Sequence, residues 1–214
     1  MKKSIQMIFV MLLLTPAHAQ QNEYYASVYF MPSVQFFKFD NLNRLLKQNG
    51  FPETGVVYTN GFGGYGTIHR WRIGGEGMYF SGSSGNANNE TSMSGGLGYF
   101  YTGYNLSFGR WQLIPAAGFG WGGLTVNATR QTDTSLQNLL STQPNSSQIT
   151  NGNSFIHTGL SLERILANSF YLGIKGSYNA ALSSTTWSAP GLTSSVADPF
   201  GGFQASLVVG FLLK

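Results

Sequence analysis

The chain has 214 residues, only 9% of them charged, and its formal net charge at pH 7 is +4. Soluble domains usually carry charged side chains at about a quarter of their positions, so this composition argues against a conventional soluble surface. The absence of any basic run argues against nucleic-acid binding. Because there is no cysteine and histidine occurs only three times, disulfide bonds are excluded, and we expect neither a metal site nor a cofactor.

The first 19 residues have the pattern of a secretory signal peptide. Lys2 and Lys3 precede an apolar run from Ile5 to Leu14, and the small-residue sequence 17–19 is a typical cleavage pattern. A membrane anchor would need about 17–25 apolar residues, and this run is shorter. We therefore expect cleavage after Ala19, which leaves 214 − 19 = 195 residues (20–214) as one barrel domain.

The rest of the chain is rich in aromatic residues and glycine, in segments where apolar and polar residues alternate. Such alternation predicts β-strands, and most segments reach the roughly 9–11 residues that a tilted strand needs to cross a membrane. We expect an all-β fold, a closed antiparallel up-and-down transmembrane β-barrel. Its eight strands are predicted at 24–39, 56–70, 72–82, 92–106, 110–127, 154–165, 169–182 and 200–213.

The predicted connections alternate between short and long. Tight turns are expected at 70–72, 107–109 and 166–168, and long links at 40–55, 83–91, 128–153 and 183–199. Short periplasmic turns and long extracellular loops are typical of outer-membrane barrels. With the N-terminus inside, the short turns would face the periplasm and the long loops the cell exterior.

The period of two also predicts which side chains point into the barrel. His157, Gly159, Ser161 and Glu163 would face inward from one strand, and Lys175 from the next. In the last strand, Gln204 and Ser206 would face inward, and Phe203 and Leu207 outward. The segment 110–127 is ambiguous, because both of its faces are apolar or glycine.

The whole mature chain resembles the class of eight-stranded outer-membrane barrels that includes the small OmpA-like and OmpX-like barrels. Its final strand, 204–214, is similar to the C-terminal strand that the barrel-assembly machinery reads, although it ends in Lys214 and not in an aromatic residue. The resemblance implies a place in the bacterial outer membrane, contact with its lipid and insertion by that machinery. It implies no particular activity, because such barrels have many functions.

Charged residues on the inward faces predict a polar network in the lumen. An isolated charge at low dielectric is costly, so these charges should be paired. The network could be a structural plug or a switchable salt-bridge gate in a narrow channel. Because side chains mostly fill the interior of eight-stranded barrels, we favour the plug. The predicted members are Arg72, Glu76, His157, Glu163 and Lys175, with His69 as a further candidate.

Aromatic residues near the strand ends are predicted to form two girdles at the membrane interfaces, where an apolar ring with a polar tip is favoured. The periplasmic girdle would contain Tyr24, Tyr25, Trp71, Phe108, Trp111 and Phe170, and the outer girdle Tyr58, Phe80, Trp187 and Phe200.

Two long loops contain the pattern Leu-x-x-Leu-Leu, which predicts short helices. The first spans 40–50, with Asp40 as N-cap and Gly50 as stop, and the second lies at 133–140. Such short helices are marginal alone, so their leucines must be buried. The helices would cap the barrel mouth, or alternatively contact outer-leaflet lipid, an extracellular partner or an apolar ligand. The leucines concerned are Leu42, Leu45, Leu46, Leu136, Leu139 and Leu140.

Two other patterns carry little functional weight. Residues 61–66 and 118–123 match G-x-G-x-x-G, but neither opens a helix of a βαβ unit, so dinucleotide binding is not expected. His157, Ser161 and Glu163 are the residue types from which hydrolases build a catalytic triad. They should face the lumen, however, whereas the lipid deacylases of the outer membrane have their active sites on the lipid side. We therefore expect no enzyme.

The function expected from the sequence is a non-enzymatic outer-membrane barrel with a structural or surface-interaction role and a largely plugged lumen. The alternatives are a narrow gated pore for small solutes and a lipocalin-like periplasmic barrel that binds an apolar ligand. A lipid hydrolase is the least favoured.

Overall fold

A computed structural model describes residues 24–86, 88–130, 146–166, 169–188 and 197–213. The predicted signal peptide lies outside these residues, as does the predicted second helix with Leu136, Leu139 and Leu140. Eight long strands dominate the structure. They are β1 (Tyr24–Phe37), β2 (Val56–Ile68), β3 (Trp71–Gly85), β4 (Asn89–Tyr104), β6 (Trp111–Arg130), β7 (Ser146–Ile165), β8 (Phe170–Ala181) and β11 (Gly202–Leu213).

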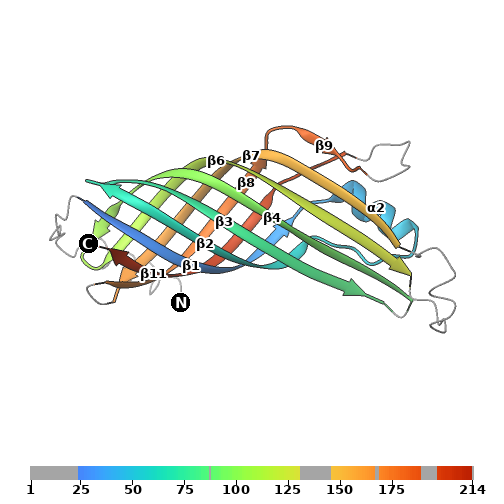
Figure 1. The fold of residues 1–214 in the computed structure, drawn as a ribbon, viewed down its shortest axis with the longest axis horizontal. Helices are drawn as coiled ribbons and strands as arrows, with labels where there is room; N and C mark the ends of the chain where they lie inside the picture. Colours follow the sequence, from blue (N-terminus) through green and yellow to red (C-terminus); the bar gives the residue numbers. More distant parts are fainter. Residues whose placement is uncertain (1–23, 87, 131–145, 167–168, 189–196, 214) are drawn as a thin grey trace, which may run out of the picture.

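These strands close into a barrel (Figure 1). Every neighbouring pair is antiparallel, β1 pairs with β11, and β4 pairs with β6 to complete the ring. The short strand β5 (Leu106–Phe108) follows β4 and pairs with β6. The predicted fold class, a closed eight-stranded up-and-down barrel, is confirmed.

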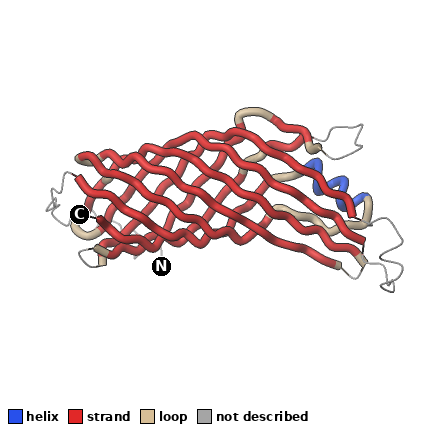
Figure 2. The backbone as a smooth tube through the Cα atoms, in the orientation of Figure 1, coloured by secondary structure: helices blue, strands red, loops and turns tan. Residues whose placement is uncertain are grey.

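The two ends of the barrel differ (Figures 1 and 2). One end, here the terminal end, holds the start of β1, the end of β11 and the short connections. The other, here the helix end, holds α2 (Asp40–Gln48) and a small sheet of β9 (Ser184–Thr186) and β10 (Ala197–Pro199). The helix predicted at 40–50 is thereby confirmed. No helix in the described part of the chain is long and apolar enough to span a membrane.

Two of the predicted long loops are wrong in extent, because strands continue through them. The β3–β4 ladder runs to the pair Gly85–Glu90, and the β6–β7 ladder runs to Thr129–Ser146. Apart from Ala128 and Ile149, these segments consist of polar residues and glycine, so they lack the alternation used to predict strands. Backbone hydrogen bonds hold a ladder without it.

Side chains alternate between the interior and the outer wall. The inward residues predicted on β7, β8 and β11 are buried, except for Gly159, which is half-buried; this confirms the phase of these strands. On β6, where the sequence was ambiguous, Ile114, Leu124 and Val126 face inward and Phe119 and Trp121 face outward. Glycines at 118, 120 and 122 share the inward face. A Cβ atom at Gly120 or Gly122 would overlap the ring of Phe155 or Phe200, and one at Gly118 would overlap the backbone of β4.

The outer wall carries an apolar belt of exposed side chains. Each of the eight long strands contributes to it, for example through Phe30, Phe62, Ile73, Phe100, Phe119, Leu160, Ile174 and Leu207. Of the charged residues on the eight long strands, four point inward and the others, Glu90, Arg130 and Arg164, lie at strand ends. The wall between the two ends is therefore uncharged in the described strands.

The predicted girdles are only partly correct. Trp71, Trp111 and Phe170 lie on the outer wall near the terminal end, and Phe108 pairs with Trp111 there. Tyr58 is 77% exposed near the helix end. The side chain of Tyr24 lies outside the described part of the structure. Four other members lie inside the barrel: Phe80, Trp187 and Phe200 are buried at the helix end, and Tyr25 turns inward against Tyr65, with ring centroids 6.1 Å apart. Phe80 has the same parity as the buried residues Arg72 and Glu76, which accounts for its inward position.

Candidate functional site

The lumen contains a bidentate ion pair between opposite walls. Arg72 on β3 donates from Nη1 to Oε1 of Glu163 on β7 at 3.0 Å, and from Nη2 to Oε2 at 2.9 Å. Arg72 Nη2 also donates to Gln112 at 2.6 Å, and the guanidinium lies 3.9 Å from the centroid of the Tyr65 ring. Both charged side chains are at most 5% exposed, so each charge is balanced within the protein and away from water.

A second ion pair joins Lys175 on β8 to Glu76 on β3. Lys175 Nζ lies 2.6 Å from Oε1 of Glu76. The same oxygen accepts a hydrogen bond from the hydroxyl of Tyr29 at 2.6 Å, and the other carboxylate oxygen accepts one from Tyr99. Although Arg72 and Glu76 share one face of β3, each therefore bonds to a different strand across the barrel.

His157 lies beside this network without carrying a charge pair. Its Nδ1 is 2.8 Å from Oδ1 of Asn179, and its ring stacks on Tyr99 with the centroids 3.9 Å apart. His69, the further candidate, is exposed in the β2–β3 turn at a φ of 57°, so its predicted place in the lumen is wrong. No group of three potential metal ligands occurs among the described residues.

The polar side chains leave little free space between the two ion pairs. The cavity that they line has a volume of about 10 Å³, which is room for about one water molecule. Its walls include Tyr29, Tyr101, Ser161 and both carboxylates. At this level the barrel interior is filled by its own side chains, as expected for eight strands.

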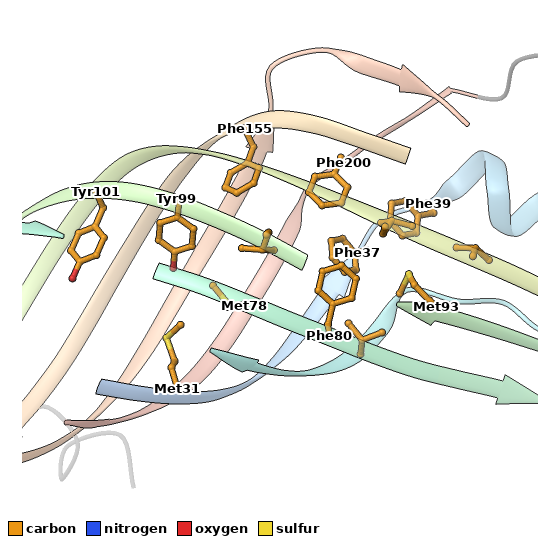
Figure 3. Packing of buried hydrophobic residues seen from close by; sticks show 14 of the residues in the cluster. Met31, Phe37, Phe39, Met78, Phe80, Met93, Tyr99, Tyr101, Phe155 and Phe200 are labelled. Atoms are coloured by element: carbon orange, nitrogen blue, oxygen red, sulfur yellow. The ribbon is translucent and has the colours of Figure 1, made fainter. Parts of the chain in front are cut away.

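Between the polar network and the helix end, a chain of aromatic contacts fills the lumen (Figure 3). We call this group the aromatic plug. Neighbouring rings in it have centroids between 5.2 and 6.2 Å apart, which is the range of favourable aromatic pairs. In order of contact from the helix end, its members are Trp187, Phe39, Phe37, Phe200, Phe155 and Tyr99.

Helix α2 places two of its leucines on the plug. Leu42 and Leu46 are buried in the same apolar cluster as Phe37 and Phe39, while Leu45 is 38% exposed. The helix ends in a Schellman motif at Gly50, whose φ is 80°: Phe51 N donates to Leu46 O at 2.9 Å. The predicted glycine stop is thus confirmed.

The start of α2 is held by a residue from a distant loop. The backbone amides of Asn41 and Leu42 donate to the carboxylate of Asp198, at 3.0 and 2.8 Å. The indole nitrogen of Trp187 donates to the same carboxylate at 3.1 Å. The predicted N-cap, Asp40, is wrong: it is the first helical residue, and no side chain of the helix itself caps this end. Asp198 is 1% exposed, so α2, β10 and the segment around Trp187 form one cap.

Sequence reasoning missed several residues of this interior. Parity could have identified Tyr29, Tyr99 and Tyr101, which alternate with outward residues on β1 and β4. No local pattern marks Asp198 as the cap of α2, because Asn41 and Leu42 are more than 150 residues away from it in the chain.

The residues considered for hydrolysis do not form a catalytic triad. Nδ1 of His157 is engaged by Asn179, and its Nε2 has no hydrogen-bond partner among the described residues. The carboxylate of Glu163 is committed to Arg72. A triad would need His157 to bond to both a nucleophile and an acid, and neither bond is present.

No protein-family model and no curated protein matches the chain. Among solved structures, the chain is similar to Ail, the attachment invasion locus protein of Yersinia pestis, with a TM-score of 0.50 and 11% identity over 89% of this chain and 97% of Ail. The N-terminal β-barrel domain of Pseudomonas aeruginosa OprF gives a TM-score of 0.47 and 12% identity, over 87% of this chain and 97% of that domain. The outer membrane protease OmpT of Escherichia coli gives 0.44 and 6%, over 91% and 97%. At 11% identity, the similarity to Ail bears on the fold and not on activity; the chain has the fold of the small eight-stranded outer-membrane barrels.

Proposed function

We propose that the chain is a non-enzymatic, non-conducting barrel of the bacterial outer membrane that acts through its cap at the helix end. The observation that carries this proposal is the filled lumen. The ion-pair network, the aromatic plug and the cap follow one another along the barrel interior.

The apolar belt supports the place in a membrane. Soluble monomers rarely expose apolar patches larger than a few hundred Å², whereas every long strand here exposes large apolar side chains. An outward apolar band with polar residues inside is typical of outer-membrane barrels. The predicted signal peptide supplies the route of export.

The difference between the two ends supports an orientation. Short connections lie on the periplasmic side of such barrels and longer ones outside. The terminal end would thus face the periplasm, and α2 with β9 and β10 would face the exterior. In this orientation Leu45 and Gln48 are exposed on the outer face of α2, where a partner or a neighbouring lipid molecule could contact them.

The interior bonds favour a structural role over catalysis or gating. His157, Ser161 and Glu163 lack the bonds of a triad, and both ion pairs carry further hydrogen bonds that hold them in place. The buried leucines of α2 favour a cap over a helix that leaves the barrel to bind an apolar ligand.

Conductance measurement tests the proposal against the gated-pore alternative. The mature chain is reconstituted in planar lipid bilayers, and folding is checked by heat-modifiable gel mobility. We expect no conductance steps from the wild type, nor from Lys175→Met, which breaks the pair with Glu76. Discrete steps in the wild type would contradict the proposal, and a rise on Lys175→Met would identify this pair as a gate. A chain that stays monomeric without detergent would contradict the place in a membrane.

A further inference from the structure

Three exposed arginines form an arc around part of the terminal end. Arg70 lies in the β2–β3 turn, Arg110 in the β5–β6 turn, and Arg164 is the next-to-last residue of β7. Backbone bonds place them on adjoining strands: Ile165 N donates to Arg110 O at 2.8 Å, and Asn105 N donates to Arg70 O at 2.7 Å. We call these three residues the arginine arc.

The arc carries positive charge that nearby described residues do not balance. None of its members forms an ion pair within the described part of the chain. Of the acidic residues described, Glu76 and Glu163 are committed in the lumen, and the rest lie toward the helix end. At the helix end, basic and acidic residues are mixed, as in the pairs Lys38–Asp40 and Lys47–Glu53.

Aromatic residues place the arc at the level of a membrane interface. Arg164 faces outward opposite Trp111 in the β6–β7 ladder, and its guanidinium lies 5.3 Å from the centroid of a Trp111 ring. Beside Arg70, the rings of Trp71 and Tyr104 meet edge to face with centroids 5.2 Å apart. Tryptophan and tyrosine favour the headgroup level of a bilayer, and arginine stems extend along apolar surface toward it.

We propose that the arginine arc binds the phosphate headgroups of anionic phospholipid in the periplasm-facing leaflet. The inference rests on the orientation given under the proposed function. A guanidinium donates two parallel hydrogen bonds to a phosphate, and adjoining arginines can share one headgroup. Each basic residue near an anionic membrane surface contributes about 1 kcal/mol, which corresponds to about fivefold in affinity.

The test measures lipid retention by native mass spectrometry. The mature chain, folded in neutral detergent, is titrated with phosphatidylglycerol or with phosphatidylcholine of the same acyl chains. We expect at least a tenfold preference for phosphatidylglycerol, and its loss in the variant Arg70→Gln/Arg110→Gln/Arg164→Gln. The control variant Lys38→Gln/Arg44→Gln/Arg130→Gln removes the same charge from the helix end and should keep the preference. Heat-modifiable gel mobility shows that each variant is folded.

Three results would overturn the inference. These are equal retention of the two lipids, equal loss in the arc and control variants, or binding of inorganic phosphate as tight as that of phosphatidylglycerol. A fourth result, displacement of the lipid by soluble acidic peptidoglycan fragments, would overturn it as well and assign the arc to the cell wall. If surface labelling finds the terminal end outside the cell, the proposed orientation fails as well; if that labelling agrees and lipid preference is absent, only the inference about the arc fails.

Discussion

At the scale of single residues, the buried charges connect walls that are not neighbours in the sheet. The partners of β3 in the ladder are β2 and β4, yet Arg72 reaches β7 and Glu76 reaches β8. Because a buried charge without its partner is costly, these pairs should stabilise the barrel by linking strands that are not neighbours. Their removal should show as lost stability.

Replacing Arg72 by Met leaves the carboxylate of Glu163 buried and unpaired. We expect the free energy of unfolding to fall by about 3–5 kcal/mol. The double variant Arg72→Met/Glu163→Leu should recover much of this loss, because no unpaired charge remains. Urea unfolding of the folded barrel in detergent, followed by gel mobility, measures both. A loss of unfolding free energy in the double variant that equals or exceeds the loss in Arg72→Met would contradict the pairing.

Glycine is required where an aromatic ring crosses the lumen next to a backbone. A Cβ atom at Gly210 would overlap the ring of Tyr171, whereas one at Gly77 would meet no atom within 4 Å. Gly210→Ala should therefore cost about 1–3 kcal/mol through overpacking, and Gly77→Ala less than about 0.5 kcal/mol. The same urea experiment compares the two variants. Equal urea midpoints of unfolding would refute the claim that the Tyr171 ring requires glycine at position 210.

Parity made the inward residues predictable, while their partners were not. The sequence placed Arg72, Glu76, Glu163 and Lys175 on the inner face, where the structure has them. It did not say which carboxylate meets which cation, because that depends on the stagger of the strands around the ring. His69 was misplaced because it lies in the turn, where the alternation of a strand no longer applies.

At the scale of elements, α2 depends on residues far away in the chain. It has nine residues, too few to be stable alone in water. Two contacts compensate for this: the apolar plug under Leu42 and Leu46, and the carboxylate of Asp198 at the helix start. A negative charge at a helix N-terminus is favourable because it faces unbonded amides.

Asp198→Asn should loosen the cap. The carboxylate charge that faces two backbone amides and the Trp187 indole is then lost, and the cap should be destabilised by about 1–2 kcal/mol. This corresponds to an increase of about 5–30-fold in the fraction of molecules in which α2 is open. Trypsin cleavage after Arg44 and Lys47, followed by mass spectrometry, should accelerate accordingly. Asp40→Asn is the matched control and should accelerate cleavage less, because Asp40 makes no capping bond. The reverse order would show that Asp40 is the cap.

The presence of the strands and of this helix was predictable, but not where some of them end. The alternation of apolar and polar residues stops at the edge of the apolar belt. The mostly polar extensions of β6 and β7 beyond it were therefore predicted as a loop. The aromatic residues Phe80, Trp187 and Phe200 were assigned to a girdle on residue type alone. At the barrel mouth the same ring can face lipid or the plug, and tertiary contacts determine which.

At the scale of the whole molecule, three layers succeed one another along the barrel interior: a charged network, an aromatic plug and a cap. The outer wall is apolar between two ends of different charge. The terminal end carries the arginine arc, and the helix end carries both signs. This arrangement suits a barrel that stays closed and presents different surfaces to the two sides of a membrane.

Surface labelling of single-cysteine variants tests the membrane place and orientation most directly, because the natural chain has no cysteine. Gln48→Cys lies on the exposed face of α2, and Ser107→Cys lies beside the β5–β6 turn at the terminal end. Each is expressed in a double-membraned bacterium and treated with a membrane-impermeant maleimide. We expect Gln48→Cys to label on intact cells and Ser107→Cys only after the outer membrane is permeabilised. Labelling of Ser107→Cys on intact cells, or of neither variant until permeabilisation, would contradict the account.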